Sequence, residues 1–513
     1  MASKHRSQHG IAGAIAACTA LGVAESLSAI DSTSPTIVEA AGLTFIDRFA
    51  ATLKDVAVAV FGTHHKSALI IGTWLVIIGL ATAASSSPKR SRRNFTLLVA
   101  VIGVVGLAAF LTRPLSNAPL GVIAITAGLV TGLVLHRHLL RITTPATSDK
   151  EPSFERPGEA LGNRRQFMLV AGSAIAGTAG ATALATTVRR RSLNSEPAVT
   201  APLPTPSTST PPIENTLDGI DGITPFITPN SDFYRIDTAL VIPKVDPSTW
   251  SLTIDGMVDR PQTLTYQDLI EASTEVETVT IACVSNEVGG NLVGNATWQG
   301  VRLADVLDRA GIQQGASQIV GHSVDGFTAG MPTATALDGR VALIATAMNG
   351  TPLPQRHGFP ARLIVSGLFG YVSATKWLSR IELTTWEATD GYWIPRGWSK
   401  EAPVKLTSRI DVPQRSSISA GVTPIAGIAL SPSIGISRVE VSINDGPWQS
   451  AELGDHSNDN TWVQWHLPWH ATNGDHIIRV RAIDNDGNAQ DETPRSVAPD
   501  GATGYHRRRV TVG

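Results

Sequence analysis

The chain of 513 residues contains only two cysteines, Cys18 and Cys283. Two thiols cannot build a framework of several bridges, so a disulfide-stapled fold is excluded in any compartment. No Cys-x-x-Cys-His motif occurs, which also excludes covalent attachment of a c-type haem. The formal net charge is only −2, and this near balance argues against nucleic acid as a partner.

Length and hydropathy predict several domains, the first of them in a membrane. One hydrophobic core rarely grows beyond about 250–300 residues, so this chain should hold more than one. Mean hydropathy is slightly positive, and the apolar excess lies before residue 190. Crossing a hydrocarbon core takes about 17–25 residues per helix. Five apolar runs are candidates, namely Ile11–Ala29, Ser67–Ala84, Asn94–Leu111, Leu120–Leu135 and Phe167–Thr187.

The stretch Thr36–Phe61 carries charges at roughly helical spacing, which favours an amphipathic helix on the membrane surface. Five spans are therefore predicted for residues 1–191, with six as the alternative. The basic residues between the spans share one side if the N-terminus is cytoplasmic and five helices cross. Arg189, Arg190 and Arg191 then lie outside, against this rule.

Arg164 and Arg165 precede the last apolar run, which is rich in glycine and alanine. This pair resembles an internal twin-arginine export signal, although an ordinary basic flank explains it equally well. The chain after residue 191 is predicted to lie outside the cell (plasma) membrane, anchored by the multi-pass helical region.

Four histidines, His64, His65, His136 and His138, lie at the ends of predicted helices. Paired histidines can ligate a b-type haem, but neither pair is placed at mid-membrane depth. We therefore expect no haem and attribute these histidines to solvation at the membrane surface.

The remaining chain divides by composition. Residues 192–225 are assigned to a linker rich in proline, threonine and serine, and the composition of Ser192–Asn215 within it predicts an extended, mobile tether without a core. Residues 226–412 and 413–513 are predicted to be two folded domains. In the second, short alternating strands favour an antiparallel sandwich. These strands are Ile425–Leu430, Ile436–Ile443, Trp462–Leu467, His476–Ala482 and Arg508–Val512.

The stretch around Cys283 is the candidate centre of domain 226–412. The β-branched run Val276–Ile281 predicts a strand that enters the core just before this cysteine. A polar, glycine-rich loop follows, which allows the backbone to approach a large group closely. A thiolate at this place suits a transition metal, whereas composition alone favours a buried structural thiol.

From Cys283 to Leu303 the chain follows the pattern Cys-x-Ser-Asn-x-x-Gly-Gly-x-Leu-x-Gly-x-Ala-x-Trp-x-Gly-Val-x-Leu. This pattern resembles the cysteine loop of the sulfite oxidase-like molybdopterin-dependent oxidoreductases, here in a membrane-anchored bacterial form. The resemblance covers nearly everything from Pro229 to Gly513. It implies an α+β molybdopterin domain, then an immunoglobulin-like dimerisation domain. It also implies a mononuclear molybdenum held by one pyranopterin and by Cys283.

The same resemblance assigns further residues to the site. An Asn-x-x-Phe-Tyr segment begins at Asn230, and a His-Gly-x-Pro-x-Arg segment is followed by Gly-x-x-x-x-x-Lys-Trp. Turn residues, packed aromatics and solvated charges are the alternative explanations. The implied catalytic residues are Cys283, Tyr234 and, more weakly, His322. The implied cofactor-binding residues are Asn230, Tyr234, Arg235, Cys283, His357, Arg362, Thr375 and Lys376.

The implied reaction is oxo transfer to or from a small molecule. Electrons would pass through a separate partner, a cytochrome or a quinone-linked protein. Sulfite oxidases proper have an arginine soon after the cysteine, whereas this chain has Val284-Ser285-Asn286-Glu287. Reduction of an S-oxide or N-oxide on the same centre therefore stays open. The rivals are a non-catalytic, membrane-tethered binding module and a helical bundle that is itself a transporter or faces quinol.

Overall fold

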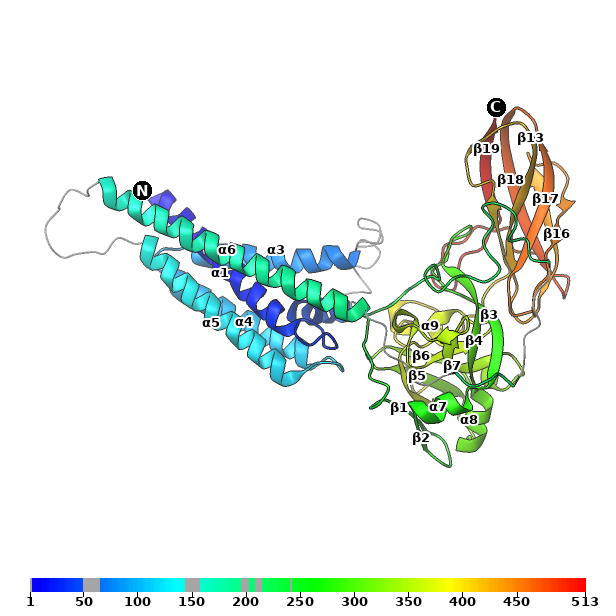
Figure 1. The fold of residues 1–513 in the computed structure, drawn as a ribbon, viewed down its shortest axis with the longest axis horizontal. Coiled ribbons are helices and arrows are strands. Elements are labelled where there is room, and N and C mark those ends of the chain that lie inside the picture. Colours follow the sequence, from blue (N-terminus) through cyan, green and yellow to red (C-terminus); the bar gives the residue numbers. More distant parts are fainter. Residues whose placement is uncertain (1, 49–64, 144–156, 195–202, 208–214, 240–241) are drawn as a thin grey trace. The chain divides into compact units, whose positions relative to one another are not determined.

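The computed structural model describes the chain except for residues 1, 49–64, 144–156, 195–202, 208–214 and 240–241 (Figure 1). The chain divides into two compact units, Met1–Glu196 with Ala239–Lys244 and Pro197–Thr238 with Val245–Gly513. The first consists of helices, and strands dominate the second. They are called the helical unit and the strand unit below.

The helical unit contains five long helices (Figure 1). They are α1 (Ala2–Ser28), α3 (His65–Ser85), α4 (Ser91–Leu111), α5 (Ala118–Thr143) and α6 (Pro157–Asn194). All five are long and apolar enough to cross a membrane, which confirms the predicted number for the described residues. Half of the apolar stretch of α1 is buried, because this helix packs against α3, α5 and α6. Much of the apolar surface of the other helices is exposed, as expected where lipid covers a protein.

The predicted surface helix Thr36–Phe61 is helical at residues 37–48, whereas residues 49–61 lie outside the described part. Its first turn is tied to α1, since the backbone N–H of Val38 donates to the carboxylate of Glu25 at 2.8 Å. This contact accounts for the one acidic residue within the predicted spans.

Arg189 of α6 is buried rather than solvated. It forms an ion pair with Glu39 at 3.1 Å and donates a hydrogen bond to the backbone oxygen of Ser34 at 2.9 Å. The ion pair with Glu39 therefore explains why Arg189 carries a positive charge on the side where the other basic residues predict none. Arg191, two residues on, is exposed.

His136 of α5 corrects the expectation that the histidines are solvated at the membrane surface. Its side chain is only 1% exposed, and its Nε2 lies 3.2 Å from Ser85 Oγ of α3. A hydroxyl partner offsets the cost of burying the imidazole. His138 is exposed and His65 begins α3, whereas His64 lies outside the described residues.

Two sheets form the first part of the strand unit. One has the order β2-β1-β10-β5-β6, made of Gln262–Thr265, Ser251–Gly256, Leu378–Thr384, Gln318–Ser323 and Thr328–Pro332. The other has the order β3-β4-β7-β8, made of Glu275–Ala282, Val293–Arg302, Ala342–Met348 and Thr351–Pro352, and β9 (Arg362–Val365) pairs with β7. The short helices are α7 (Tyr266–Ala272), α8 (Leu303–Ala310) and α9 (Gly370–Ser373).

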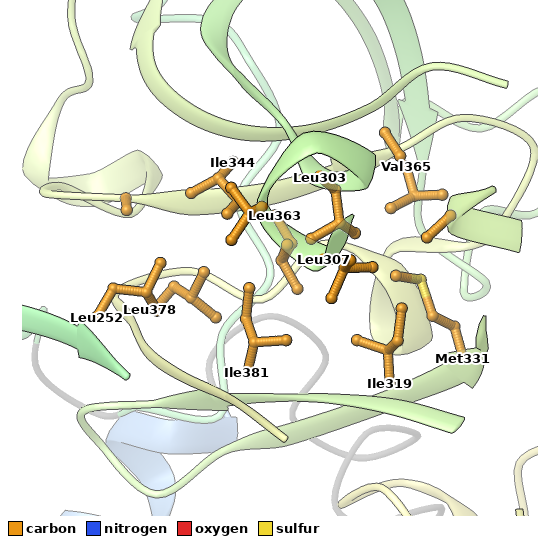
Figure 2. Close-up of a cluster of buried hydrophobic side chains, with 14 of the residues drawn as sticks. Leu252, Leu303, Leu307, Ile319, Met331, Ile344, Leu363, Val365, Leu378 and Ile381 are labelled. Atoms are coloured by element: carbon orange, nitrogen blue, oxygen red, sulfur yellow. The ribbon is translucent and has the colours of Figure 1, made fainter. Parts of the chain in front are cut away.

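Apolar side chains from both sheets and from α8 meet in one core (Figure 2). Leu303 and Leu307 of α8 lie in this core with Ile344 of β7 and Ile319 of β5, and all four are fully buried. Burial of each such side chain contributes about 1.5–3 kcal/mol. This core holds the strands from which the candidate site residues project.

The last part of the strand unit is a pair of sheets with a shared core. The first sheet is β11 (Thr407–Val412), β13 (Gly421–Leu430), β17 (Val463–Ala471) and β16 (Glu452–Leu453). The second is β12 (Ser417–Ile418), β19 (His506–Val512), β18 (Gly474–Asp484), β14 (Ile436–Ile443) and β15 (Gln449–Ser450). The five predicted strands are confirmed, and their ends agree with the observed ones to within four residues.

The described parts of segment 192–225 do not form a free tether. Residues 192–194 continue α6, while 195–202 and 208–214 lie outside the described residues. Ser207 donates its N–H to the backbone oxygen of Thr274 at 2.9 Å, and Ile223 packs against Val412. The described parts of the predicted linker therefore contact the strand unit, and Ile223 lies beyond Ser192–Asn215, the stretch predicted to be a mobile tether.

Candidate active site

Cys283 follows β3 directly and opens a loop, residues 283–292, called the cysteine loop below. The loop is closed on itself, since the backbone N–H of Cys283 donates to the oxygen of Leu292 at 2.9 Å. The side-chain oxygen of Asn286 accepts the N–H of Leu292 at 2.8 Å, and the N–H of Asn286 donates to the oxygen of Cys283 at 3.0 Å. These bonds hold the thiol at the end of a rigid strand.

The thiol of Cys283 is buried, with the residue only 9% exposed. Burial raises the pKa of this thiol, and hydrogen bonding from Ser285 partly opposes the effect. The N–H of Ser285 points at the sulfur across 3.4 Å. A positive charge close to the sulfur, such as that of a metal ion, would favour the thiolate at this position.

A pocket that is partly open to solvent lies in front of this thiol. Tyr234, Cys283, Arg362 and Lys376, all assigned to the site from the sequence, line it together. They come from four separate segments, so the fold brings together residues up to 142 positions apart. Phe327, Tyr371, Trp377 and Trp393 add an aromatic wall.

Arg362 of β9 is a buried cation without an anion. The residue is 6% exposed, and its Nη1 donates to the backbone oxygen of His357 at 3.3 Å. Its guanidinium lies 5.3 Å from the centre of the Trp298 ring. Among the described residues no carboxylate pairs with it, and its buried Nε has no hydrogen-bond partner. Burial lowers its pKa to about 10, so it remains charged at neutral pH and suits an anionic ligand.

Lys376 also lines the pocket, but its charge is already balanced. Its ammonium forms an ion pair with Asp237 and donates to the backbone oxygen of Ile236 at 3.1 Å. Arg235 pairs with the same carboxylate at 3.1 Å from a side chain that is 43% exposed. Asp237 thus pairs with two of the predicted cofactor-binding residues, Arg235 and Lys376. Of these two, Arg235 does not line the pocket.

Tyr234 places a phenol beside the thiol. Burial raises the pKa of this hydroxyl, nearby Cys283 adds to the increase, and Arg362 opposes it. Phe233 stacks on the ring with 5.3 Å between the centroids and thereby orients it. The phenol consequently keeps its proton at neutral pH and can donate it in a hydrogen bond.

Asn230, His357 and Thr375 lie outside the pocket lining. His357 is 1% exposed and donates from Nε2 to the backbone oxygen of Asn230 at 2.8 Å. The Asn230 side chain accepts a hydrogen bond from Asn349 at 2.8 Å. The Thr375 hydroxyl is buried without a partner among the described residues and faces Gly321, where an added Cβ would lie 2.7 Å away.

Two histidines of the strand unit, the buried His357 and the half-buried His506, predict a loss of stability in acid. Burial lowers the pKa of His357 and of His506 from 6.5 to about 4. Between these values the unfolded chain binds protons that the folded chain excludes, so the free energy of unfolding decreases as pH falls from 6.5 to 4. A shift of this size corresponds to about 3 kcal/mol per histidine.

Thermal unfolding of the full chain without cofactor, followed by tryptophan fluorescence from pH 7 to pH 4, measures this loss. In His357→Gln the melting temperature is expected to fall less over that range, because one titrating imidazole is gone. An identical fall in both proteins would contradict the assignment to His357.

His322, a predicted catalytic residue, does not line the pocket. Its Nε2 lies 2.9 Å from the carboxylate of Glu382 on the neighbouring strand β10, with Arg380 beside it. Successive side chains of a strand point to opposite faces, so Ser323 lines the pocket instead. Asp325, two residues further along the chain, also lines the pocket, although the sequence motifs did not assign it to the site. The structure therefore places His322 beside the pocket rather than in its lining, and a catalytic role for it stays a prediction.

Comparisons with known proteins indicate the family. Residues 239–393 match the family model described as oxidoreductase molybdopterin binding domain. An uncharacterized oxidoreductase, YuiH of Bacillus subtilis (strain 168), is 35% identical over 154 residues, which cover 30% of this chain and 74% of that protein. Mitochondrial sulfite oxidase of Rattus norvegicus is 30% identical over 324 residues, covering 53% of this chain and 58% of that protein.

The chain thus spans about three fifths of the length of the rat protein. Among solved structures, the sulfane dehydrogenase SoxCD from Paracoccus pantotrophus has a similar fold, with a TM-score of 0.51 and 20% sequence identity. The similarity covers 63% of this chain and 92% of that chain.

Proposed function

Because the chain belongs to the sulfite oxidase-like molybdopterin-dependent oxidoreductases, we propose that it transfers an oxo group at a mononuclear molybdenum centre. One observation carries this proposal. A single pocket is lined by a buried thiol, Cys283, and by a buried, unpaired arginine, Arg362. A soft thiolate suits molybdenum, and an unpaired buried cation suits the anionic groups of one pyranopterin.

The residues of the pocket fit this cofactor by their chemistry. Cys283 is the proposed metal ligand, while Arg362 and Lys376 are proposed to bind the anionic groups of the pterin. When bound, the cofactor supplies two-electron oxo transfer, and the protein supplies binding, orientation and electrostatics. For Asn230, Arg235, His357 and Thr375 we propose indirect roles in shaping the same site.

Tyr234 is the proposed catalytic hydrogen-bond donor. Its hydroxyl keeps the proton because burial disfavours the phenolate. From the pocket wall it can donate to an oxygen atom of the substrate and orient it. The aromatic side chains of Phe327, Tyr371 and Trp393 exclude water around that oxygen.

The substrate class follows from the charges in the pocket. Sulfite oxidation is the family's namesake reaction, but a sulfite dianion requires cations that remain available. Arg362 and Lys376 are both assigned to the cofactor, Asp237 already pairs with Lys376, and Asp325 adds a negative charge. These charges favour a second candidate, reduction of a neutral S-oxide or N-oxide.

The choice between sulfite and a neutral S-oxide or N-oxide is tested by comparing kcat/KM for the two kinds of substrate. With a reduced dye as electron donor, kcat/KM for a neutral S-oxide is expected to exceed kcat/KM for sulfite measured with an oxidised dye. Asp325→Asn is expected to raise kcat/KM for sulfite relative to the S-oxide, because one like charge is removed. Preference for sulfite in the wild type, unaffected by Asp325→Asn, would instead favour a sulfite oxidase.

The cofactor itself is tested by elemental analysis and pterin fluorescence of protein made in a host that synthesises and inserts it. Molybdenum and pterin are expected at close to one per chain. Absence of both would refute the enzymatic proposal and leave the binding-module alternative.

The cellular setting is proposed from the helices. Five apolar helices anchor the chain in the plasma membrane, and the strand unit lies on the extracytoplasmic side, exported with the aid of Arg164 and Arg165. A cytochrome or quinone-linked protein accepts or supplies the electrons. The two sheets formed by β11 and the strands of residues 413–513 are proposed to be an immunoglobulin-like domain, and a homodimer through it is part of the proposal.

A further inference from the structure

Two residues of the last part of the strand unit, Arg409 and His506, contact the cysteine loop. Arg409 of β11 donates from Nη1 to the backbone oxygen of Gly290 at 2.7 Å. His506 of β19 packs against Gly289, where an added Cβ would lie only 2.4 Å from Nε2. Gly289 also has a φ of +78°, so both conformation and space require glycine there.

Arg409 is itself held rigidly. Its Nε donates to the Asp411 carboxylate at 2.7 Å, and its Nη2 donates to Thr224 Oγ1 at 2.5 Å. The N–H of Thr224 donates in turn to the other oxygen of Asp411 at 3.1 Å. The side chain of Arg409 is only 13% exposed. Its guanidinium is therefore held in place and donates one hydrogen bond, from Nη1, to the loop.

His506 is fixed in a similar way. Its Nδ1 accepts the backbone N–H of Ile410 at 2.9 Å, which sets both the ring orientation and the tautomer. The ring edge therefore faces Gly289 as a rigid wall. Two adjacent residues of the loop, Gly289 and Gly290, thus contact fixed groups of β11 and β19.

We propose that Arg409 and His506 are positioning residues for the metal-binding cysteine. The restraint reaches Cys283 through the loop, because the N–H of Gly290 donates to the oxygen of Glu287 at 2.8 Å and Asn286 joins Cys283 to Leu292. The inference rests on the proposed ligation by Cys283. On this proposal, β11 and the sheets of residues 413–513 help to position the metal-binding cysteine, in addition to any dimer contact.

The first test measures the loop in full-chain protein without cofactor. In a Cys18→Ser background only Cys283 reacts, so its rate of alkylation by iodoacetamide reports how well the loop shields the thiol. Arg409→Met is expected to raise this rate about tenfold, as loss of one charged hydrogen bond allows. Amide hydrogen exchange is expected to accelerate similarly in residues 284–292 and to stay unchanged in β17 and β18.

Arg409→Lys keeps one donor and is expected to restore part of the protection. The matched control is Arg481→Met, which removes an arginine of β18 whose ion pair, with Glu440 at 2.7 Å, does not reach the loop. It is expected to leave the alkylation rate at the wild-type value. Equal alkylation and exchange in wild type and Arg409→Met would overturn the proposal, as would the same acceleration in Arg481→Met.

In loaded protein, the Mo(V) electron paramagnetic resonance spectrum of Arg409→Met is expected to broaden or divide into several species, since the sulfur samples several positions. A spectrum identical to the wild type would overturn the positioning role. If the wild-type protein contains neither molybdenum nor pterin, the proposed function fails, whereas the alkylation and exchange experiments still decide whether Arg409 restrains the loop.

Discussion

Cys283→Ser is expected to reduce turnover by more than the roughly 10–100-fold that typically follows loss of a group supporting a metal ligand. Serine is nearly isosteric, but its hydroxyl is a hard, weakly acidic donor that poorly replaces a thiolate on molybdenum. Because the side chain is buried at the end of β3, the substitution leaves the backbone of the loop in place. The measurements are kcat with a dye as electron partner, molybdenum content and the Mo(V) spectrum.

Cys18→Ser is the matched control, since it removes the other cysteine, which lies in α1 of the helical unit. Its turnover and spectrum are expected to equal those of the wild type. Pterin is expected to persist in Cys283→Ser, because Arg362 and Lys376 are intact. A Cys283→Ser protein with wild-type turnover and an unchanged spectrum would show that the thiol is structural.

Sequence patterns located the centre of the site because its residues lie in short, continuous motifs. Cys283, Arg362 and Lys376 each belong to such a motif, and the structure brings them to one pocket. His322 does not line the pocket, for a reason that the sequence does not show. Which face of β5 meets the pocket depends on its pairing with β10 and β6, and a shift of one residue exchanges the two faces.

Long-range contacts escaped prediction altogether. Arg409 and Gly290 are 119 positions apart, and Arg189 and Ser34 are 155 apart, so no local pattern connects either pair. Composition also did not show that the described parts of the predicted linker, residues 203–207 and 215–225, contact the strand unit. A few apolar residues such as Leu217 and Ile223 suffice to dock these pieces on the strand unit.

Arg362→Met is expected to separate cofactor binding from folding. Methionine matches much of the apolar length of arginine but has no charge, so the anionic groups of the pterin lose a buried partner. Molybdenum and pterin content are expected to fall about tenfold or more, the effect of losing a charged hydrogen bond. Arg362→Lys is expected to be intermediate, since it keeps the charge without the planar fork.

The stability of cofactor-free Arg362→Met should not decrease, in contrast to its cofactor content. In protein without cofactor, Arg362 is a buried charge with no carboxylate partner among the described residues, which costs free energy. The melting temperature of cofactor-free Arg362→Met is therefore expected to equal or exceed that of the cofactor-free wild type. Arg340→Met is the control, because Arg340 pairs with Asp338 at 2.7 Å and does not line the pocket. It should retain full cofactor. A destabilised Arg362→Met protein with normal molybdenum content would instead make Arg362 a structural residue.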